Sequence, residues 1–263
     1  METRSADEVK KKIKDFALGM GVDDVGFATV SDYQSPRSPS IESLFPAARS
    51  MVVLTYKELS NCESPSPQMS MAGRLDIMEF ARSCNYKLCR FLEKEFRCTA
   101  MSTPLSYPLD MGKKAGNGTI GDVSCRHAAL AAGQGNFGRN NLIIHPTLGA
   151  RVIFAVILTS LELPSDPPVT EDLCIQCNIC VENCPAGALD EEGKTDVLKC
   201  LGKSQPYGIM ASISFWRKFI DSPPEEQKKM FRDENYLRLY QSAFIGFQYH
   251  CFNCYMLCPI GQD

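Results

Sequence analysis

The sequence predicts an α+β protein of two domains, an α/β layer domain over residues 1–165 and a cysteine-rich domain over residues 166–263. In the first part, helical and strand-like apolar patterns alternate, which is typical of layered α/β folds. A proline-rich stretch at residues 163–170 then separates the two parts. Eight of the 13 cysteines follow this stretch, in two dense runs and one isolated position.

The elements of both domains follow from apolar spacing and from the positions of glycine and proline. In chain order, the first domain is predicted to contain a helix that ends near Gly19, strands over 25–28 and 51–56, helices over 74–96 and 128–132, and strands over 142–144 and 151–161. Loops rich in Ser and Pro are expected at 31–40 and 60–68. In the second domain, helices are expected over 215–220 and 225–244. The strand order cannot be read from the sequence.

The cysteine runs have the spacing of iron–sulfur ligands. The first run reads C-x2-C-x2-C-x3-C-P from Cys174 to Pro185, which is the bacterial ferredoxin pattern. In that pattern three thiolates bind one cluster, and the fourth, before proline, binds a different cluster. We therefore expect two [4Fe-4S] clusters with crossed ligands. One is assigned to Cys174, Cys177, Cys180 and Cys258, and the other to Cys184, Cys200, Cys251 and Cys254.

Two alternatives to these clusters are a pair of four-cysteine zinc sites and a set of disulfides. Pairs of cysteines spaced C-x2-C also bind zinc, but the complete run with its matching C-x3-C-P favours iron. Disulfides are disfavoured because the spacing is that of metal ligands. Five cysteines remain: Cys62, Cys84, Cys89, Cys98 and Cys125. Of these, Cys84, Cys89 and Cys98 are expected to be ordinary buried residues.

Composition and charge indicate an ordinary globular protein of 263 residues, 44% hydrophobic and 22% charged. The net charge of −3 and the pI of about 5.7 give no broad basic surface for nucleic acid. The first residues lack the apolar core of a secretory signal, and no stretch is apolar enough to span a membrane. We expect a cytoplasmic protein.

A glycine-rich block follows the helix predicted at 128–132. Gly133, Gly135 and Gly138 are spaced G-x-G-x-x-G, and Arg139 and Asn140 come directly after them. A dinucleotide-binding loop needs a strand before the glycines and a helix after them, which is the reverse of the order here. The block is therefore either a tight turn or a place where the backbone approaches a large cofactor.

Several segments resemble the epoxyqueuosine reductase family and, more distantly, the iron–sulfur part of reductive dehalogenases. They are V-D-D-V-G-F-A at 22–28, A-A-G-Q-G-N-F-G-R-N at 131–140, the strand at 151–158, and the complete cysteine layout with its isolated Cys200. The resemblance covers nearly the whole chain.

The resemblance implies a nitroreductase-like N-terminal domain that binds cobalamin, with flavin as a second candidate cofactor. An external low-potential donor, such as ferredoxin or flavodoxin, would pass electrons through both clusters to the corrinoid, which would reduce a small substrate. The cofactor-contact residues would come from the glycine block: Gly133, Gly135, Gly138, Arg139 and Asn140.

The chain departs from the family pattern at three places. Asn136 stands where the family has a tryptophan. The family's catalytic aspartate aligns with Thr119, so Asp122 takes the proton-donor role only with a small gap. The chain ends soon after the last cysteine run, where the tRNA-modifying enzymes continue, so we expect a small-molecule substrate rather than tRNA. Other candidates for proton donation or cofactor contact are Tyr56, Tyr107, Asp110, His127, His145 and His250.

These departures favour an alternative function, a non-catalytic electron-transfer partner. Such a protein would deliver low-potential electrons to a client, for example a corrinoid protein. The retained N-terminal domain favours an enzyme instead, because a simple electron carrier needs only the cysteine-rich part.

Overall fold

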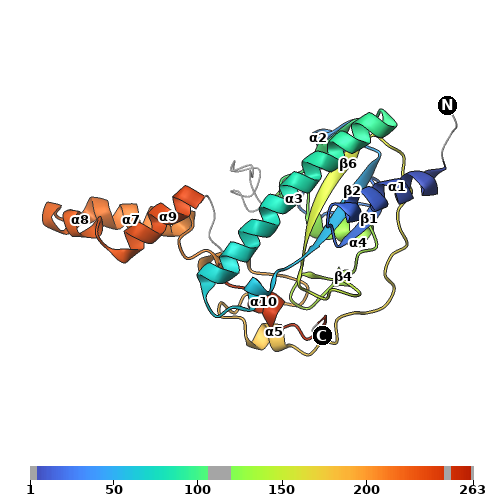
Figure 1. The fold of residues 1–263 in the computed structure, drawn as a ribbon. Coiled ribbons are helices and arrows are strands. Elements are labelled where there is room, and N and C mark those ends of the chain that lie inside the picture. Colours follow the sequence, from blue (N-terminus) through green and yellow to red (C-terminus); the bar gives the residue numbers. More distant parts are fainter. Residues whose placement is uncertain (1–4, 106–119, 246–249, 262–263) are drawn as a thin grey trace.

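The computed structural model of the chain describes residues 5–105, 120–245 and 250–261. Its centre is a four-stranded antiparallel sheet with strand order β1-β2-β6-β3 (Figure 1). The strands are β1 (Asp24–Thr29), β2 (Ser50–Lys57), β6 (Val152–Thr159) and the short edge strand β3 (Ala100–Ser102). The sequence predicted the first three of these strands and missed β3.

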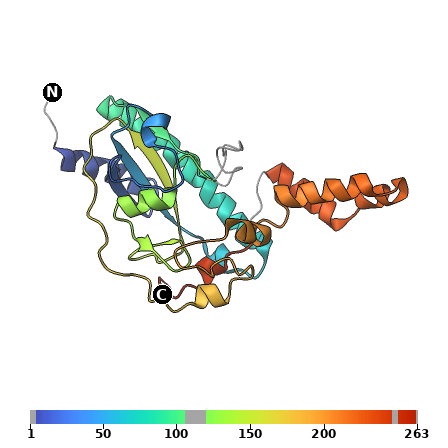
Figure 2. The same ribbon diagram turned by 180° about the vertical axis from the view of Figure 1, so that it is seen from behind.

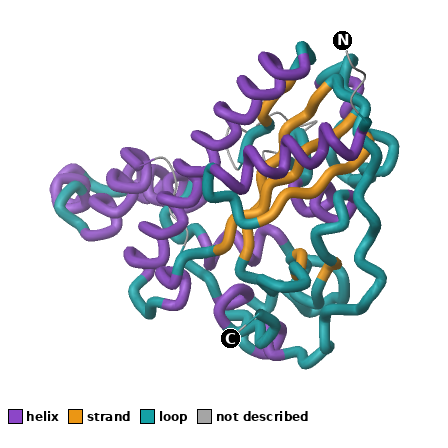
Figure 3. Tube along the Cα trace, turned by 45° about the vertical axis from the view of Figure 1, so that its right-hand side comes forward, coloured by secondary structure: helices purple, strands orange, loops and turns teal. Residues whose placement is uncertain are grey.

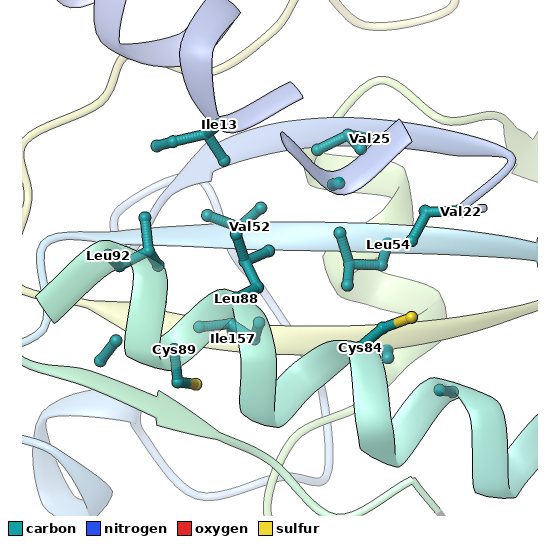
Figure 4. Close-up of a cluster of buried hydrophobic side chains, with 14 of the residues drawn as sticks. Ile13, Val22, Val25, Val52, Leu54, Cys84, Leu88, Cys89, Leu92 and Ile157 are labelled. Carbon is teal, nitrogen blue, oxygen red and sulfur yellow. The ribbon is translucent and has the colours of Figure 1, made fainter. Parts of the chain in front are cut away.

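The sheet is buried on both faces because its central strands carry apolar residues at almost every position. Val52, Leu54 and Tyr56 of β2 pack on one side, against α1 (Ala6–Gly19) and the long helix α3 (Pro67–Phe96). Figure 4 shows Leu88 and Leu92 of α3 in this cluster. On the other side, Met51 and Val53 pack with α2 (Ile41–Leu44) and α4 (Cys125–Ala131), which lies in front of the sheet in Figure 2, the view from behind.

The helix ends follow local capping rules. At α1, Ser5 and Glu8 form a reciprocal capping box. Helix α3 begins at Pro67 rather than at residue 74, because Ser66 caps it and proline is well suited to the first turn. It ends where Arg97 takes the left-handed conformation, with φ 53°. The polar loop predicted at 60–68 also contains a short 3-10 helix, η1 (Ser60–Glu63).

The second half of the chain has little regular structure around the cysteines. Its short helices there are α5 (Ile179–Glu182), α6 (Val197–Ser204) and α10 (Asn253–Met256). In the first half, a small hairpin of β4 (Asn136–Phe137) and β5 (Ile143–Ile144) precedes β6. Between α6 and α10 an arm of three helices projects from the body, as Figures 1 and 3 show. These are α7 (Ile209–Asp221), α8 (Pro224–Met230) and α9 (Glu234–Ile245).

The helix predicted over 225–244 is two helices, because the chain turns at residues 231–233. The side chain of Asp233 accepts a hydrogen bond of 2.8 Å from the N–H of Asn235 at the start of α9. The mixed α and β architecture is confirmed. The domain boundary at 165/166 stays a prediction. Among the described helices, none has the length and hydropathy needed to cross a membrane.

Candidate functional site

Four cysteines from both runs line one surface pocket. They are Cys174, Cys177, Cys180 and Cys258, which share this pocket with Arg139 and Asn140. This is the grouping that the crossed ligand assignment requires, since Cys258 lies beside the first run and not with its sequence neighbours. Cys177 is exposed, whereas Cys180 and Cys258 are buried. We call this group the outer cysteine site.

The other four cysteines form a second group, the inner cysteine site, made of Cys184, Cys200, Cys251 and Cys254. Burial raises the pKa of Cys254 to about 12, and charge on Cys251, Cys184 and Cys200 acts in the same direction. Burial likewise raises the pKa of Cys200, with Cys251 and Cys184 as charged neighbours. Thiols crowded in this way stay protonated unless a bound cation compensates their charge.

The backbone of the first run wraps around the outer cysteine site. Gln176 and Asn178 both adopt the left-handed conformation, with φ 52° and 58°. Two backbone N–H groups donate to sulfur: Arg139 to Cys174 at 3.4 Å and Ala188 to Cys184 at 3.3 Å. Hydrogen bonds of this kind tune the potential of an iron–sulfur cluster. Within the described residues, no three His, Cys, Asp or Glu side chains are arranged around a single-metal position.

Arg151 joins the sheet to the last cysteine run. Its guanidinium donates to the carbonyls of Met256 at 2.7 Å and Cys258 at 3.1 Å, and its Nε donates to Glu63 at 3.0 Å. The amide of Asn140 adds a bond of 3.2 Å to the carbonyl of Cys254. These contacts hold the segment that supplies ligands to both predicted clusters.

The glycines of the predicted cofactor loop pack against protein. A Cβ at Gly133 would collide with the carbonyl of Pro167, and one at Gly135 would collide with the carbonyl of Ile144. Both glycines have positive φ, 66° and 141°. Packing against Pro167 accounts for Gly133, and packing within the β4–β5 hairpin accounts for Gly135. Arg139 and Asn140, the other two residues of the predicted cofactor loop, line the outer cysteine site. Contact between this loop and a corrinoid stays a prediction.

Asn136, at the family's tryptophan position, is also engaged in packing. Its amide donates to the carbonyls of Val169 at 3.1 Å and Glu171 at 2.7 Å, in the segment that leads into the first cysteine run.

A further pocket lies where the sheet meets the cysteine-rich half. We call it the inter-domain pocket, after the predicted domain boundary. Its wall is largely apolar, with two arginines, a thiol and a phenol, as its lining shows: Arg74, Met78, Leu105, Cys125, Arg126, Leu142, Ile143, Val152, Ile153, Phe154 and Tyr255. Tyr255 directly follows Cys254 of the inner cysteine site. Largely apolar pockets with a few polar groups are the usual ligand sites of proteins.

Among the residues that the structure describes, the predicted proton donors do not line this pocket. Asp122 is exposed and does not line the inter-domain pocket. Tyr56 is 2% exposed in the core, where burial raises its pKa. Tyr107, Asp110 and Thr119 lie outside the described residues. The role of Asp122 stays a prediction.

The three histidines have separate environments. His127 faces Ser124, with 2.8 Å between Nδ1 and Oγ, and burial lowers its pKa. His250 packs against Tyr207, with 5.5 Å between ring centroids. His145 is bonded at both nitrogens, to Asp24 at 3.2 Å and to the turn at Thr147 and Leu148. The bonding of His145 is that of a structural residue.

Asp24 is expected to contribute to stability at neutral pH. Burial alone would raise its pKa, but bonds to His145, the backbone of Val25 and Lys14 outweigh it and lower the pKa from 3.8 to about 2. A carboxylate with a lowered pKa stabilises the fold above its unfolded pKa, and this contribution disappears as pH falls from about 4 to about 2. Asp24→Asn should therefore cost about 1–2 kcal/mol at pH 7 and almost nothing at pH 2.

Urea unfolding at both pH values checks this expectation. An equal loss for Asp24→Asn at pH 7 and pH 2 would show that the side chain acts by packing rather than by charge.

Sequence reasoning did not single out Arg74, Arg126 or Arg151. No motif marks them, since each acts through contacts with distant segments. The buried ion pair between Arg74 and Glu58 illustrates this, because it joins α3 to the turn after β2 and its side chains are 14% and 1% exposed. Arg74 also lies 4.9 Å from the ring centroid of Tyr255.

The 4Fe-4S binding domain family model matches residues 167–190, which contain the first cysteine run. Among curated proteins, the epoxyqueuosine reductase of Bacillus anthracis is 25% identical over 281 residues, covering 96% of this chain and 64% of the relative. That of Bacillus subtilis is 26% identical over 277 residues, covering 97% of this chain and 64% of the relative. The chain thus spans just under two thirds of the length of these relatives.

Solved structures agree on the fold. An epoxyqueuosine reductase bound to a tRNA stem loop matches with a TM-score of 0.63 at 21% identity, covering 98% of this chain and 66% of that one. A structure titled as a reductive dehalogenase, with a mechanism for B12-dependent dehalogenation, matches with a TM-score of 0.50 at 21% identity, covering 72% of this chain and 28% of that one.

The relatives correct one expectation. The sequence argument set tRNA aside because the pI is acidic and the chain ends after the last cysteine run, but an epoxyqueuosine reductase of matching fold has been solved with a tRNA stem loop. The expectation was wrong because overall charge does not exclude a local nucleic-acid surface. With its ferredoxin-type cysteine run and similarity over nearly its whole length, the chain is related to the epoxyqueuosine reductases.

Proposed function

We propose that the chain is an iron–sulfur oxidoreductase that passes electrons through two [4Fe-4S] clusters to an acceptor in the inter-domain pocket. The observation that carries this proposal is the adjacency of Cys254 and Tyr255. Cys254 belongs to the inner cysteine site, and the next residue lines the pocket. An acceptor there would lie close to one cluster and away from solvent-facing Cys177.

The two cysteine sites differ in a way that gives the path a direction. The outer site includes exposed Cys177, so an external donor such as ferredoxin or flavodoxin could approach it. Cys254 of the inner site couples electrostatically to Cys180 of the outer site, so the two groups are neighbours. Electrons would therefore enter at the outer site and leave at the inner one.

A corrinoid is the proposed acceptor, by the family resemblance and by the B12-dependent chemistry named for one structural relative. The pocket, of about 150 Å³, is smaller than a corrinoid, so its wall would contact only the periphery of the group. Arg126 can donate to acetamide or phosphate groups, and Ile153 and Phe154 offer apolar surface. When bound, the group supplies a redox-active cobalt centre. Flavin has no support from the relatives.

The substrate class is proposed from the relatives. Their name and the tRNA stem loop in one of their structures make an epoxyqueuosine-bearing stem loop the first substrate to test. Small electrophilic molecules are the next class. A proton source is required in either case, and Asp122 remains the proposed residue.

The test is anaerobic reconstitution with iron and sulfide, followed by addition of cobalamin or, separately, of flavin. We expect cobalamin to bind and its visible spectrum to change when the clusters are reduced, and the modified stem loop to be consumed. Cobalamin that binds but is not reduced through the clusters would contradict the proposal.

Asn136 favours a second candidate, an electron-transfer partner. Where the family has tryptophan, this side chain is occupied by Val169 and Glu171 and so is committed to packing. If the chain binds neither cobalamin nor flavin but reduces a separate corrinoid protein, this second function is correct.

A further inference from the structure

Arg126 is a partly buried cation that lines the inter-domain pocket. It is the second residue of α4, and its guanidinium donates to the carbonyl of Asn141 and lies 5.9 Å from the ring centroid of Phe137. Burial is the main cause that lowers its pKa. Among the described residues, no carboxylate forms an ion pair with it. The other arginines of this region do have such partners, Glu58 for Arg74 and Glu63 for Arg151.

The neighbours of Arg126 act in both directions: Tyr255 and Cys125 raise its pKa, but a phenol is neutral at neutral pH and so provides no counter-charge there. The charge of Arg37 lowers the pKa of Arg126 further. Cys125 does not supply a negative charge at neutral pH, because burial raises its pKa to about 11. Arg74 lines the same pocket, so two guanidinium groups border one cavity with a mostly apolar wall.

A partly buried charge with no counter-charge among the described residues is costly to a fold, and proteins ordinarily pair such charges. The open space beside Arg126 is where a partner can lie. We infer that the inter-domain pocket recognises an oxyanion, phosphate or carboxylate, on its ligand, and that Arg126 is the residue that binds this group. The guanidinium presents a planar set of donors that matches both anions.

This inference deepens the proposed function, on which it rests for the claim that the ligand is the electron acceptor. The apolar wall formed by Leu142, Ile153 and Phe154 would take the uncharged body of that ligand. An acceptor with an anionic group at one end and an apolar or planar body therefore fits the pocket. The competing explanation is that Arg126 only holds the Asn141 carbonyl and with it the β4–β5 hairpin.

The two explanations differ in their response to anions. Thermal unfolding of the protein with both clusters is compared in chloride, inorganic phosphate and acetate at one ionic strength. We expect the parent to gain about 2–4 °C once the favoured anion exceeds its Kd about fivefold. A larger rise in phosphate indicates a phosphate-bearing ligand, and a larger rise in acetate indicates a carboxylate.

Arg126→Gln keeps a donor for the Asn141 carbonyl and removes the charge, so it should lose the anion response. Arg126→Lys should retain part of it, and the exposed control Arg82→Met should retain all of it. Arg126→Met is a second charge-removing variant should the glutamine variant fail to fold.

Full anion response in a folded charge-removing variant, or none in the parent with either anion, would overturn the inference. The measurement needs no electron transfer. A parent that responds to anions but fails to reduce any acceptor therefore refutes the proposed function and leaves the anion site standing.

Discussion

Cys258→Ser is expected to remove the cluster of the outer cysteine site and to spare the cluster that involves Cys251 and Cys254, its own sequence neighbours. The reason is spatial, because Cys258 shares a pocket with Cys174, Cys177 and Cys180. Iron should fall from about eight to about four atoms per chain, as loss of one four-iron cluster requires. Iron and sulfide analysis of anaerobically purified protein measures this directly.

Double variants identify which cluster is lost. Cys258→Ser combined with Cys177→Ser should retain the same iron as Cys258→Ser alone, since both serines affect one site. Cys258→Ser combined with Cys200→Ser should lose nearly all iron. The reverse pattern, in which the Cys200 variant adds nothing to the Cys258 variant, would mean that the ligands follow sequence order and are not crossed.

Arg151→Met is expected to cause a large loss of stability. The Arg151 side chain is 6% exposed and serves the carbonyls of Met256 and Cys258 as well as Glu63. Removing the guanidinium leaves the carbonyls of Met256 and Cys258 without their donors. It also breaks the ion pair with Glu63, in which only the Arg151 side chain is buried. We expect the free energy of unfolding to fall by about 2–5 kcal/mol.

Urea unfolding of the protein with its clusters measures this loss. Arg151→Lys keeps the charge but can contact only some of Met256, Cys258 and Glu63. Its free energy of unfolding should therefore lie between those of the parent and Arg151→Met. Arg82→Met, on the exposed side of α3, serves as the control and should change stability by less than about 0.5 kcal/mol. A loss at Arg151 no larger than this control would show that the three contacts contribute little.

The sheet was largely predictable because most of its strands are continuous apolar segments of the sequence. Strands β2 and β6 are long apolar runs, and no other arrangement suits such segments as well as burial on both faces. The edge strand β3 has only three residues, two of them exposed, so its sequence carries no strand signal. The early start of α3 at Pro67 depends on the Ser66 cap, which the polar loop composition concealed.

The cysteine sites could be predicted because thiol spacing is a direct geometric constraint. The spacing placed Cys258 beside the first run although 74 positions separate it from Cys184, and the structure brings it there. The glycine block was harder, because positive φ serves a tight turn and a cofactor contact equally well. Its packing against Pro167 and Ile144 depends on the tertiary fold.

The inter-domain pocket could not be predicted from local pattern. Its lining comes from α3, α4, the β4–β5 hairpin and β6, and α10 adds Tyr255 from the cysteine-rich half, so the pocket forms only in the folded chain. The sequence does not distinguish Arg126 from other arginines. Only the fold shows that no described carboxylate lies beside it.

The central claim, two [4Fe-4S] clusters held side by side by eight cysteines, is tested most directly by EPR of the fully reduced protein. The account predicts two unpaired spins per chain with a spectrum broadened by interaction between neighbouring clusters, together with about eight irons. A single unbroadened signal with about four irons, or stoichiometric zinc with no signal, would contradict it.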